Sequence, residues 1–358
     1  DIFAQAGSVS KRVCARFAPR PPRLRTSTID RAARDMPRFR FAVVAWAPKG
    51  SDVAVVGGHA NIGDWSPDKG HRMAGSLGND RFDSEPDYYW ADVELPPGAA
   101  DSLEFKFVYR APGAGAWTWD EGDNRKMSIN GDAEEPVLLS VEKFREGSGL
   151  EHEHTGRFYS TVKERREMSV RRISPQIVLG SCPRQKCHIN RMKEMGVTAV
   201  MNFQTEEDCM RNFVEGIGME EDALKVAELY KQVGIEYIWL PTWDMSTAGR
   251  LAMLPHGAYV MSGLIQNGHT VYVHCNAGVG RSVGAVCGYL HYCVGLSLRQ
   301  MMHVVARGRT VAFFDFVALE GARPRYQAMF GSPSKALEEQ KKQLLEAAGI
   351  GTGGAEAK

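Results

Sequence analysis

The residues best placed to do chemistry are Cys275 and Arg281, which stand six positions apart in the segment HCNAGVGRS. An apolar strand is predicted before the cysteine and a helix after the arginine, so a tight turn must join them. A thiolate is a strong nucleophile, and the N-terminus of the following helix lowers the pKa of a nearby thiol. Arginine presents a planar fork of donors that fits two oxygens of a phosphate. The spacing therefore predicts a cysteine nucleophile with a phosphate clamp.

The residues between them are predicted to form a phosphate-binding loop: Asn276, Ala277, Gly278, Val279 and Gly280. The glycines permit backbone conformations that bulkier residues avoid, so that successive N–H groups can converge on one anion. Ser282 comes next and can donate a hydrogen bond to the thiolate as it leaves. The alternative is a buried structural thiol in an ordinary strand-to-helix turn. The coincidence of strand, spacing, glycines, arginine and serine favours the phosphate loop.

A carboxylate is the expected third member of the site. Attack of a thiol on a phosphate ester needs a proton donor for the leaving alkoxide, and the phosphocysteine then needs a base to activate water. Asp244 lies in WLPTWDMSTAGR at the exit of another predicted strand, 31 residues before Cys275. Asp244 is thus the candidate general acid and base, although from spacing alone it could also be a residue that caps a turn.

Four segments around these residues resemble the dual-specificity phosphatases and, among them, the glucan phosphatases. They are LGSCPRQ (179–185), GVTAVMNFQTE (196–206), PTWDMST (241–247) and VYVHCNAGVGRS (271–282). The resemblance covers nearly all of residues 160–331. It implies that Cys275 is the nucleophile, Arg281 the phosphate clamp and Asp244 the general acid and base. Trp243 is a departure, because the resemblance predicts proline at this position.

Other residues of this region have two interpretations. Met245 and Phe313 either offer a hydrophobic surface to a glucan chain near the loop or pack in the core, and Phe330 ends the resembling region. Cys182 and Cys187 belong to a segment that could reach the active site, which leaves a redox role open. The cysteines show no metal-ligand spacing. The predicted chemistry requires neither a metal nor a cofactor.

A second set of candidates lies nearer the N-terminus and could bind carbohydrate: Trp65, Lys106, Trp119 and Asn124. Sugars present flat C–H faces that stack on aromatic rings, and their hydroxyl groups need polar partners around the rim. The alternative is that the tryptophans are core residues. Neighbouring glycine and proline residues place Trp65 and Trp119 on loops, which favours the binding role.

This region resembles the starch-binding modules of carbohydrate-binding family 20. The resemblance rests on PRFRFAVV, VVGGHANIGDW, YYWADVELP, EFKFVY and WDEGDNR. It implies that the four candidates contact α-glucan, while Trp90 is either a core residue or a second sugar contact.

The spacing of apolar residues predicts two different folds for the two regions. Residues 36–142 contain short apolar or alternating runs broken by Gly, Pro and Asp, which is typical of an antiparallel β-sandwich. Residues 158–331 alternate strand-like and helix-like stretches, which predicts an α/β domain with a largely parallel central sheet. The charged, Gly-containing stretch 143–157 is expected to be an exposed linker. Residues 332–358 are expected to form one polar helix followed by Gly-rich disorder.

The first 35 residues carry eight Lys and Arg against three Asp, so a basic, disordered leader is expected there. It is either a transit-like segment or sequence foreign to the native protein. The expected location is cytoplasmic, and the basic leader keeps a plastid as the alternative.

Overall composition excludes several classes of partner. Lys and Arg (44) nearly balance Asp and Glu (43), so nucleic acid and anionic membranes are not expected partners. No apolar run approaches the roughly 18 residues that a membrane span requires, and a soluble protein is expected. The seven cysteines lack regular spacing and are typical of reduced cytosolic thiols. The sequence leaves open whether the protein forms a homodimer.

Two functions remain from the sequence. The first is a glucan phosphatase that binds starch or glycogen and hydrolyses phosphate monoesters on it. The second is a dual-specificity protein phosphatase tethered to glucan. A non-catalytic scaffold is disfavoured because Cys275, Arg281 and Asp244 are all present. A phosphoinositide phosphatase is disfavoured because the loop NAGVG carries no lysine, and this neutral loop suits a neutral sugar ring.

Overall fold

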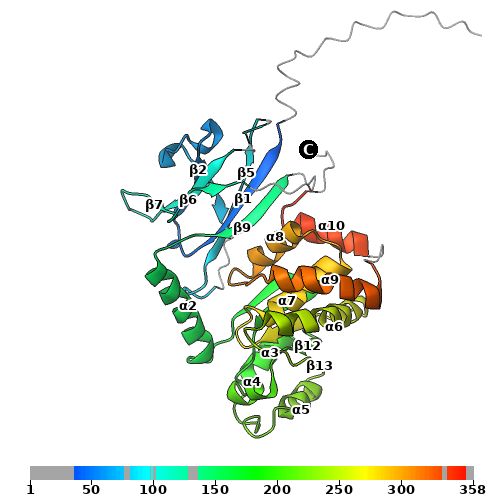
Figure 1. The fold of residues 1–358 in the computed structure, drawn as a ribbon. Helices are drawn as coiled ribbons and strands as arrows, with labels where there is room; N and C mark the ends of the chain where they lie inside the picture. The colour runs from blue at the N-terminus through cyan, green and yellow to red at the C-terminus, as the bar shows by residue number, and fades with distance from the viewer. Residues whose placement is uncertain are drawn as a thin grey trace, which may run out of the picture. The chain divides into compact units, whose positions relative to one another are not determined.

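The structure is a computed structural model that describes residues 36–75, 81–96, 98–99, 102–127, 136–332 and 337–351. The predicted basic leader and the predicted Gly-rich end after residue 351 lie outside these residues. The elements from β1 to α10 belong to one compact unit, residues 37–358 (Figure 1).

The N-terminal part is a β-sandwich of two sheets. The first sheet has the order β4 (Ala74–Gly75), β5 (Asp87–Glu94), β1 (Arg38–Ala45) and β9 (Val137–Lys143). The second has the order β3 (His71–Arg72), β2 (Asp52–Gly57), β6 (Glu104–Arg110) and β7 (Thr118–Trp119), with β8 (Arg125–Lys126) also paired to β6. Two short 3₁₀ turns, Ala60–Ile62 and Pro67–Lys69, follow β2.

The sandwich core forms because apolar residues alternate along the strands and meet between the sheets. Phe41 on β1 and Phe105 on β6 pack edge to face with ring centroids 5.0 Å apart. The predicted antiparallel β-sandwich is confirmed, with one exception among its strand pairs, because β9 runs parallel to β1. The other strands of the sandwich lie between β1 and β9 in the sequence, so no hairpin turn joins these two.

The C-terminal part is the predicted α/β domain. Its sheet has the order β10 (Val170–Ser174), β11 (Ile177–Ser181), β14 (Val271–Cys275), β12 (Ala199–Asn202) and β13 (Glu236–Trp239). All neighbours are parallel except β10 and β11, which form an antiparallel hairpin. β14 lies in the centre, with both faces buried, and ends at Cys275.

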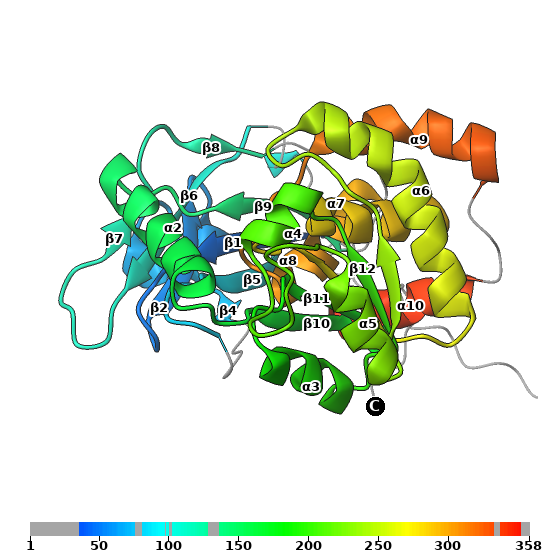
Figure 2. The same cartoon turned by 90° about the horizontal axis from the view of Figure 1, so that it is seen from below.

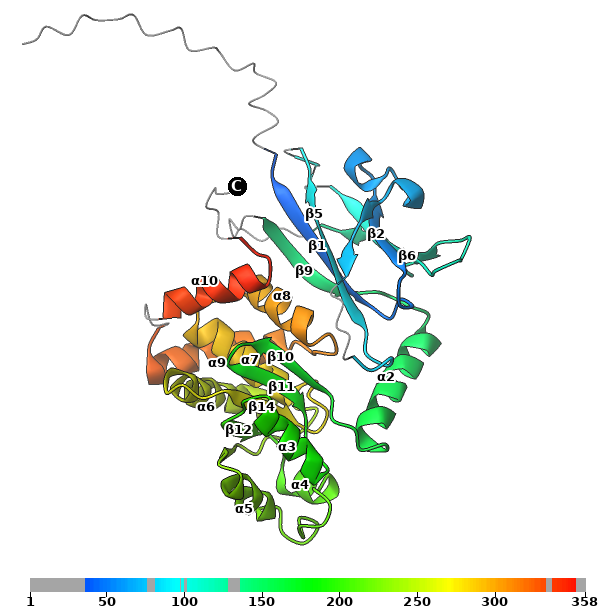
Figure 3. The ribbon, with the colours of Figure 1, turned by 180° about the vertical axis from the view of Figure 1, so that it is seen from behind.

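Helices cover both faces of this sheet. One face packs against helices α3 (Lys186–Glu194), α4 (Glu206–Arg211) and α5 (Lys225–Gln232). The other packs against α6 (Thr247–Gln266), α7 (Arg281–Gly288) with its π-helical extension (Tyr289–Cys293), α8 (Leu298–Gly308) and α9 (Phe316–Phe330). Figures 2 and 3 show these two groups from different sides. Because both faces are covered, strand ends are the exposed places where polar loops can gather.

The region between the two domains differs from its predicted form, whereas the C-terminal helix is present as predicted. The stretch expected as an exposed linker contains most of helix α2 (Ser148–Lys163), whose Phe158 and Val162 pack against Ala277 of the loop. The buried apolar residues of α2 begin only at Phe158, so the charged and exposed start of the helix gave no helical signal. The predicted C-terminal helix is present as α10 (Glu338–Ala347), and it buries Leu344 and Leu345 against the α/β core.

Among the described residues, no helix combines the length and the apolar character needed to cross a membrane.

Candidate active site

Cys275 and Arg281 lie where the sequence predicts them, at the end of β14 and the start of α7. The loop between them turns tightly at Gly278, whose φ is +71°. A Cβ atom at Gly278 would lie 2.4 Å from the carbonyl oxygen of Gly180 on the neighbouring strand. Only glycine therefore satisfies both the conformation and the space at this position.

The thiol of Cys275 is buried, with 3% of the residue exposed, and Ser282 Oγ lies 3.3 Å from its Sγ. Burial alone would raise the pKa of Cys275. The charge of Arg281, the Ser282 hydroxyl, and the backbone N–H groups of Ser282 and Gly278 outweigh this effect, and they lower the pKa below that of an ordinary thiol. The loop thus favours the thiolate form of Cys275, which is the nucleophilic form of the side chain.

The guanidinium group of Arg281 is fully buried, and all of its hydrogen bonds to the described residues are made by Nη1. Its Nη1 donates to the carboxylate of Asp208 at 2.6 Å and to the carbonyl oxygens of Thr242 at 2.9 Å and Phe203 at 3.3 Å. Nε and Nη2 make no hydrogen bond to the described residues, although Nη2 is ion-paired with Asp244. The edge formed by Nε and Nη2 thus faces only the half-exposed carboxylate of Asp244, and two oxygens of a phosphate could take the place of this carboxylate on the edge.

Asp208 is a site residue that sequence reasoning missed. Its carboxylate accepts hydrogen bonds from Arg281 and from Asn276 Nδ2, the latter at 2.8 Å. Burial alone would raise the pKa of Asp208, but these hydrogen bonds and the charge of Arg281 lower it, so the carboxylate stays ionised. The signal was present as a capping box, since Thr205 and Asp208 three positions later begin helix α4.

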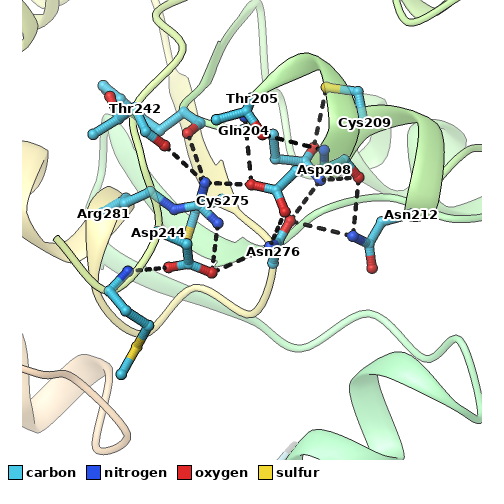
Figure 4. Close-up of polar contacts among 12 residues, drawn as sticks. Gln204, Thr205, Asp208, Cys209, Asn212, Thr242, Asp244, Cys275, Asn276 and Arg281 are labelled. Carbon is cyan, nitrogen blue, oxygen red and sulfur yellow. Dashed lines mark hydrogen bonds and ion pairs between the residues drawn. The ribbon is translucent and has the colours of Figure 1, made fainter. Parts of the chain in front are cut away.

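The side chain of Asn276 joins several of these groups (Figure 4). Its Oδ1 accepts hydrogen bonds from Gln204 Nε2 at 2.9 Å and Asn212 Nδ2 at 3.4 Å. Its Nδ2 donates to Asp208 and, at 3.3 Å, to Asp244 Oδ2. A buried amide with this many partners fixes the start of the loop in one position.

Asp244 lies over the loop, as the sequence predicts. Its Oδ2 is 2.9 Å from Arg281 Nη2, and its side chain is 49% exposed. The next residue, Met245, has a φ of +52°, and its backbone N–H donates to Asp244 Oδ1 at 3.0 Å. A left-handed conformation in a residue other than glycine is a strained arrangement. The N–H of Met245 and the guanidinium group of Arg281 together hold the two oxygens of the Asp244 carboxylate.

A pocket of about 300 Å³ opens beside Val279 of the loop. Aromatic side chains line it, namely Trp46, Phe158, Tyr159, Phe313 and Phe314. Tyr159 packs against the apolar cluster that contains Ala277 of the loop. Burial raises the pKa of Tyr159, and the negative charges of Cys275 and Asp244 raise it further. The sequence prediction included Phe313 but missed Tyr159, because the helix that carries Tyr159 was not predicted.

The remaining candidates of this domain differ in their surroundings. Met245 is 90% exposed, and Phe330 stacks on Tyr259 with centroids 4.1 Å apart. Cys182 is buried, and its Sγ donates to the carbonyl oxygen of Asn276 at 3.4 Å, so this segment does reach the loop. Burial raises the pKa of Cys182, which keeps it a thiol. Cys187 is exposed.

Lys106 and Trp119 share one face of the second sandwich sheet. Trp119 pairs with Val108 on β6, two residues from Lys106, and that face points away from the sandwich core. Lys106 Nζ donates to the carbonyl oxygens of Asp120 at 3.0 Å and Gly122 at 2.6 Å, so it holds the loop that follows Trp119.

Trp65 and Asn124 lie at the adjoining end of the same sheet. Trp65 has a φ of +63°, and its indole borders Gly58, whose N–H donates to Glu104. Asn124 Nδ2 donates to the Glu104 carboxylate at 2.9 Å. Trp90 lies on the other sheet, stacked against Arg40 and packed near Ala306 of the α/β domain.

The lowered pKa of Cys275 leads to a pH prediction. Since Arg281 and the hydrogen-bond donors hold the pKa of Cys275 below that of an ordinary thiol, the thiolate persists at pH values where an ordinary thiol is already protonated. Alkylation of Cys275 by iodoacetate should therefore have its midpoint at a lower pH than that of an ordinary thiol, and Ser282→Ala should move the midpoint upward. Mass spectrometry of the digested protein measures this, with exposed Cys187 as internal reference. A midpoint equal to that of Cys187 would refute the assignment.

Asp208 leads to a prediction about Arg281. Asp208→Asn removes the charge that holds Nη1, so the affinity for inorganic phosphate and kcat/KM should both fall by about 10- to 100-fold. The loss should be the same for every leaving group, because Asp208 does not transfer the proton. Glu207→Gln, an exposed acidic residue of the same helix, is the matched control. Unchanged phosphate inhibition in Asp208→Asn would contradict the role given to it.

Comparison with known proteins adds family membership to this geometry. Residues 38–137 match the starch binding domain family, and residues 177–316 match the catalytic domain of dual specificity phosphatases. Phosphoglucan phosphatase LSF1, chloroplastic, from Arabidopsis thaliana is 28% identical over 131 residues, which is 37% of this chain and 21% of that protein. The crystal structure of PTPMT1 aligns with 45% of this chain and 96% of its own at 24% identity, with a TM-score of 0.37.

Laforin from Mus musculus is 38% identical over 321 residues, covering 82% of this chain and 97% of that protein. The similarity therefore extends through the sandwich and the phosphatase domain in the same order. With Cys275, Arg281 and Asp244 gathered at one loop and a starch binding domain before them, the chain belongs to the laforin family.

Proposed function

We propose that this protein binds an α-glucan such as starch or glycogen and hydrolyses phosphate monoesters on it through a phosphocysteine intermediate. The observation that carries the proposal is the edge of Arg281 that remains for an anion beside a buried thiolate. Two donors on one planar edge match two oxygens of a phosphate, and the backbone N–H groups of the loop supply further donors.

In the first step, the sulfur of Cys275 attacks phosphorus, an S–P bond forms, and the P–O bond to the sugar breaks. Asp244 in its protonated form gives its proton to the leaving alkoxide, so the sugar departs as an alcohol. Arg281 holds the equatorial oxygens as the phosphoryl group becomes planar. Nη1 of Arg281 is hydrogen-bonded to Asp208 and Thr242, so the guanidinium group is already in position and does not have to reorient during the transfer.

In the second step, Asp244 as carboxylate takes a proton from water, and the oxygen of that water attacks phosphorus. The S–P bond breaks, phosphate leaves, and the electron pair returns to sulfur as the thiolate. Ser282 donates its hydrogen bond to this thiolate, since its Oγ lies 3.3 Å from the sulfur. The overall change is one phosphate monoester and one water converted to one alcohol and one phosphate.

The surroundings of the loop support a sugar as the alcohol. The loop itself carries no charged side chain between Cys275 and Arg281, and the neighbouring pocket is lined by aromatic rings such as Tyr159 and Phe313. Aromatic rings stack on the apolar faces of sugars. We infer that this pocket and exposed Met245 contact the glucan chain near the phosphorylated residue.

The sandwich supports binding at a distance from the chemistry. Trp65 lies on the loop after β2, as expected, whereas Trp119 ends the short strand β7 of the same sheet and does not lie on a loop. Lys106 fixes the backbone that follows Trp119, and Asn124 donates to Glu104. Such a module raises the local concentration of the polymer at the active site without contacting the reacting phosphate. The free cysteines of the described residues, including Cys275, suit a reducing compartment such as the cytoplasm.

The acid role of Asp244 predicts a dependence on the leaving group. Asp244→Asn should lower kcat for phosphorylated glucan by roughly 10² to 10⁴, the range for loss of a positioned acid and base. The loss in the first step should be smaller for an aryl phosphate, whose phenolate leaves without full protonation. Single-turnover release of sugar and of phenol measures this step. An equal loss for both substrates would assign Asp244 another role.

The module leads to a prediction about polymer substrates. Trp65→Ala with Trp119→Ala removes stacking worth about 1 kcal/mol or more for each ring, so binding to amylopectin should weaken at least tenfold. Phosphate release from insoluble phosphorylated starch should fall with binding, while turnover of a soluble aryl phosphate should stay unchanged. Leu224→Ala, which shortens an exposed apolar side chain of the phosphatase domain, is the control. Unchanged starch binding in the double variant would exclude this surface.

A further inference from the structure

We propose that Glu85 of the β-sandwich is a positioning residue for the phosphate loop, acting through Arg309. The proposal rests on the phosphatase chemistry given above and goes beyond it, because it makes the sandwich part of the support of the active site. Glu85 lies just before β5, and Arg309 directly follows α8. Both residues are buried, with Glu85 7% exposed and Arg309 fully enclosed.

Arg309 holds the phosphate loop by donating hydrogen bonds to two backbone carbonyl oxygens of the loop. Its Nη2 donates to the oxygen of Ala277 at 2.7 Å, and its Nε donates to the oxygen of Gly278 at 2.9 Å. In a trans peptide the carbonyl and the next N–H point in opposite directions within one plane. Arg309 therefore aims the N–H groups of Gly278 and Val279 away from itself. The N–H of Gly278 is one of those that hydrogen-bond the thiolate of Cys275.

Arg309 is in turn held by groups that Glu85 organises. Its Nη1 donates to Ser169 Oγ at 2.5 Å and lies 3.7 Å from Glu85 Oε1. The hydroxyl of Ser169 donates to the same Oε1, and Arg171 pairs with the other carboxylate oxygen. The serine hydroxyl can accept from Arg309 because its own proton is directed to Glu85. One carboxylate thus sets the orientation of the serine and of both guanidinium groups.

The charges make Glu85 necessary at this place. Burial lowers the pKa of Arg309, the negative charge of Glu85 opposes this effect, and the positive charge of Arg171 adds to it. Without Glu85, the buried guanidinium group of Arg309 and the half-buried one of Arg171 would lose the carboxylate that lies against both of them. A buried charge that loses its partner moves toward solvent or other acceptors, and Arg309 would then release the carbonyls of Ala277 and Gly278.

A second contact between the same two parts of the chain offers a matched control. Asp92 on β5 pairs with Arg40 in two-point fashion, at 2.7 and 2.8 Å, and Arg40 donates to the carbonyl oxygen of Gly349 at 2.7 Å. As with Glu85 and Arg309, a carboxylate of the sandwich faces an arginine that donates to a backbone carbonyl oxygen. Here, however, that carbonyl oxygen belongs to the C-terminal segment and not to the phosphate loop. Asp92→Asn therefore removes a comparable ion pair without touching the phosphate loop.

The test measures the loop directly, with inorganic phosphate as inhibitor of aryl phosphate hydrolysis and iodoacetate as probe of Cys275. Glu85→Gln should raise the inhibition constant of phosphate about tenfold or more and move the midpoint of Cys275 alkylation to higher pH. Asp92→Asn should change neither value more than about twofold, and glucan binding should be unaffected in both. In an Arg309→Lys background, Glu85→Gln should add no further loss, because both act through one contact.

Equal values for Glu85→Gln and Asp92→Asn would overturn the proposal, and so would effects of Glu85→Gln and Arg309→Lys that simply add. If Glu85→Gln does not fold, Ser169→Ala is the second variant, because it removes the hydroxyl between Glu85 and Arg309. It should raise the inhibition constant of phosphate and the midpoint pH of Cys275 alkylation. If both stayed unchanged, the proposal would also be overturned. These measurements use an aryl phosphate and inorganic phosphate and contain no glucan. If the wild-type enzyme failed to dephosphorylate starch, the proposed function would be contradicted, but the measured effect of Glu85→Gln on the phosphate loop would still stand.

Discussion

A negative charge on the buried sulfur of Cys275 is the constraint on which the rest of the structure depends. Burial opposes ionisation, so the thiolate exists only because positive charge and hydrogen-bond donors are fixed around it. Arg281 supplies the charge, and Ser282 and Gly278 supply donors. Each of these groups must be held in place before substrate arrives, because donors that reorient during the reaction stabilise the transition state less well.

The need for compensation continues outward from the thiolate. Arg281 is itself a buried cation, and Asp208 balances it while holding one side of its fork. The loop carbonyls that face away from the thiolate are held by Arg309, a second buried cation near Glu85. In this chain, as in the family to which it belongs, a starch binding domain precedes a phosphatase domain. Our inference adds a physical reason for packing the two domains together, because Glu85 of the first domain would hold Arg309 of the second.

The parts of this site that the sequence predicted are those with local geometry. A strand, a glycine turn and a helix follow one another within a few residues, so Cys275, Arg281 and Ser282 could be placed from spacing alone. Asp244 could be placed because it follows a strand parallel to β14, and the ends of such strands meet. The alternating apolar residues likewise predicted both folds, except for the parallel pairing of β9 with β1.

The residues that escaped prediction depend on contacts between distant segments. Asp208 meets Arg281 across 73 positions, and Glu85 lies 224 positions before Arg309. Single-sequence patterns carry no information about such pairs. Glu85 in particular belongs to a turn of the sandwich that shows no motif, and only the packing of the described domains brings it to the phosphate loop. Helix α2 escaped because its buried face, with Phe158, is confined to its last turns.

The most direct test of the glucan assignment is an internal competition. Phosphorylated starch and a phosphotyrosine peptide are incubated together with the wild-type enzyme, and release of phosphate from each is followed at low conversion, which gives the ratio of the two kcat/KM values in one reaction. The aromatic pocket beside the neutral loop and the starch binding domain predict a ratio strongly in favour of starch. Preferential turnover of the peptide, with starch phosphate released slowly, would contradict the account and identify a protein phosphatase that is tethered to glucan.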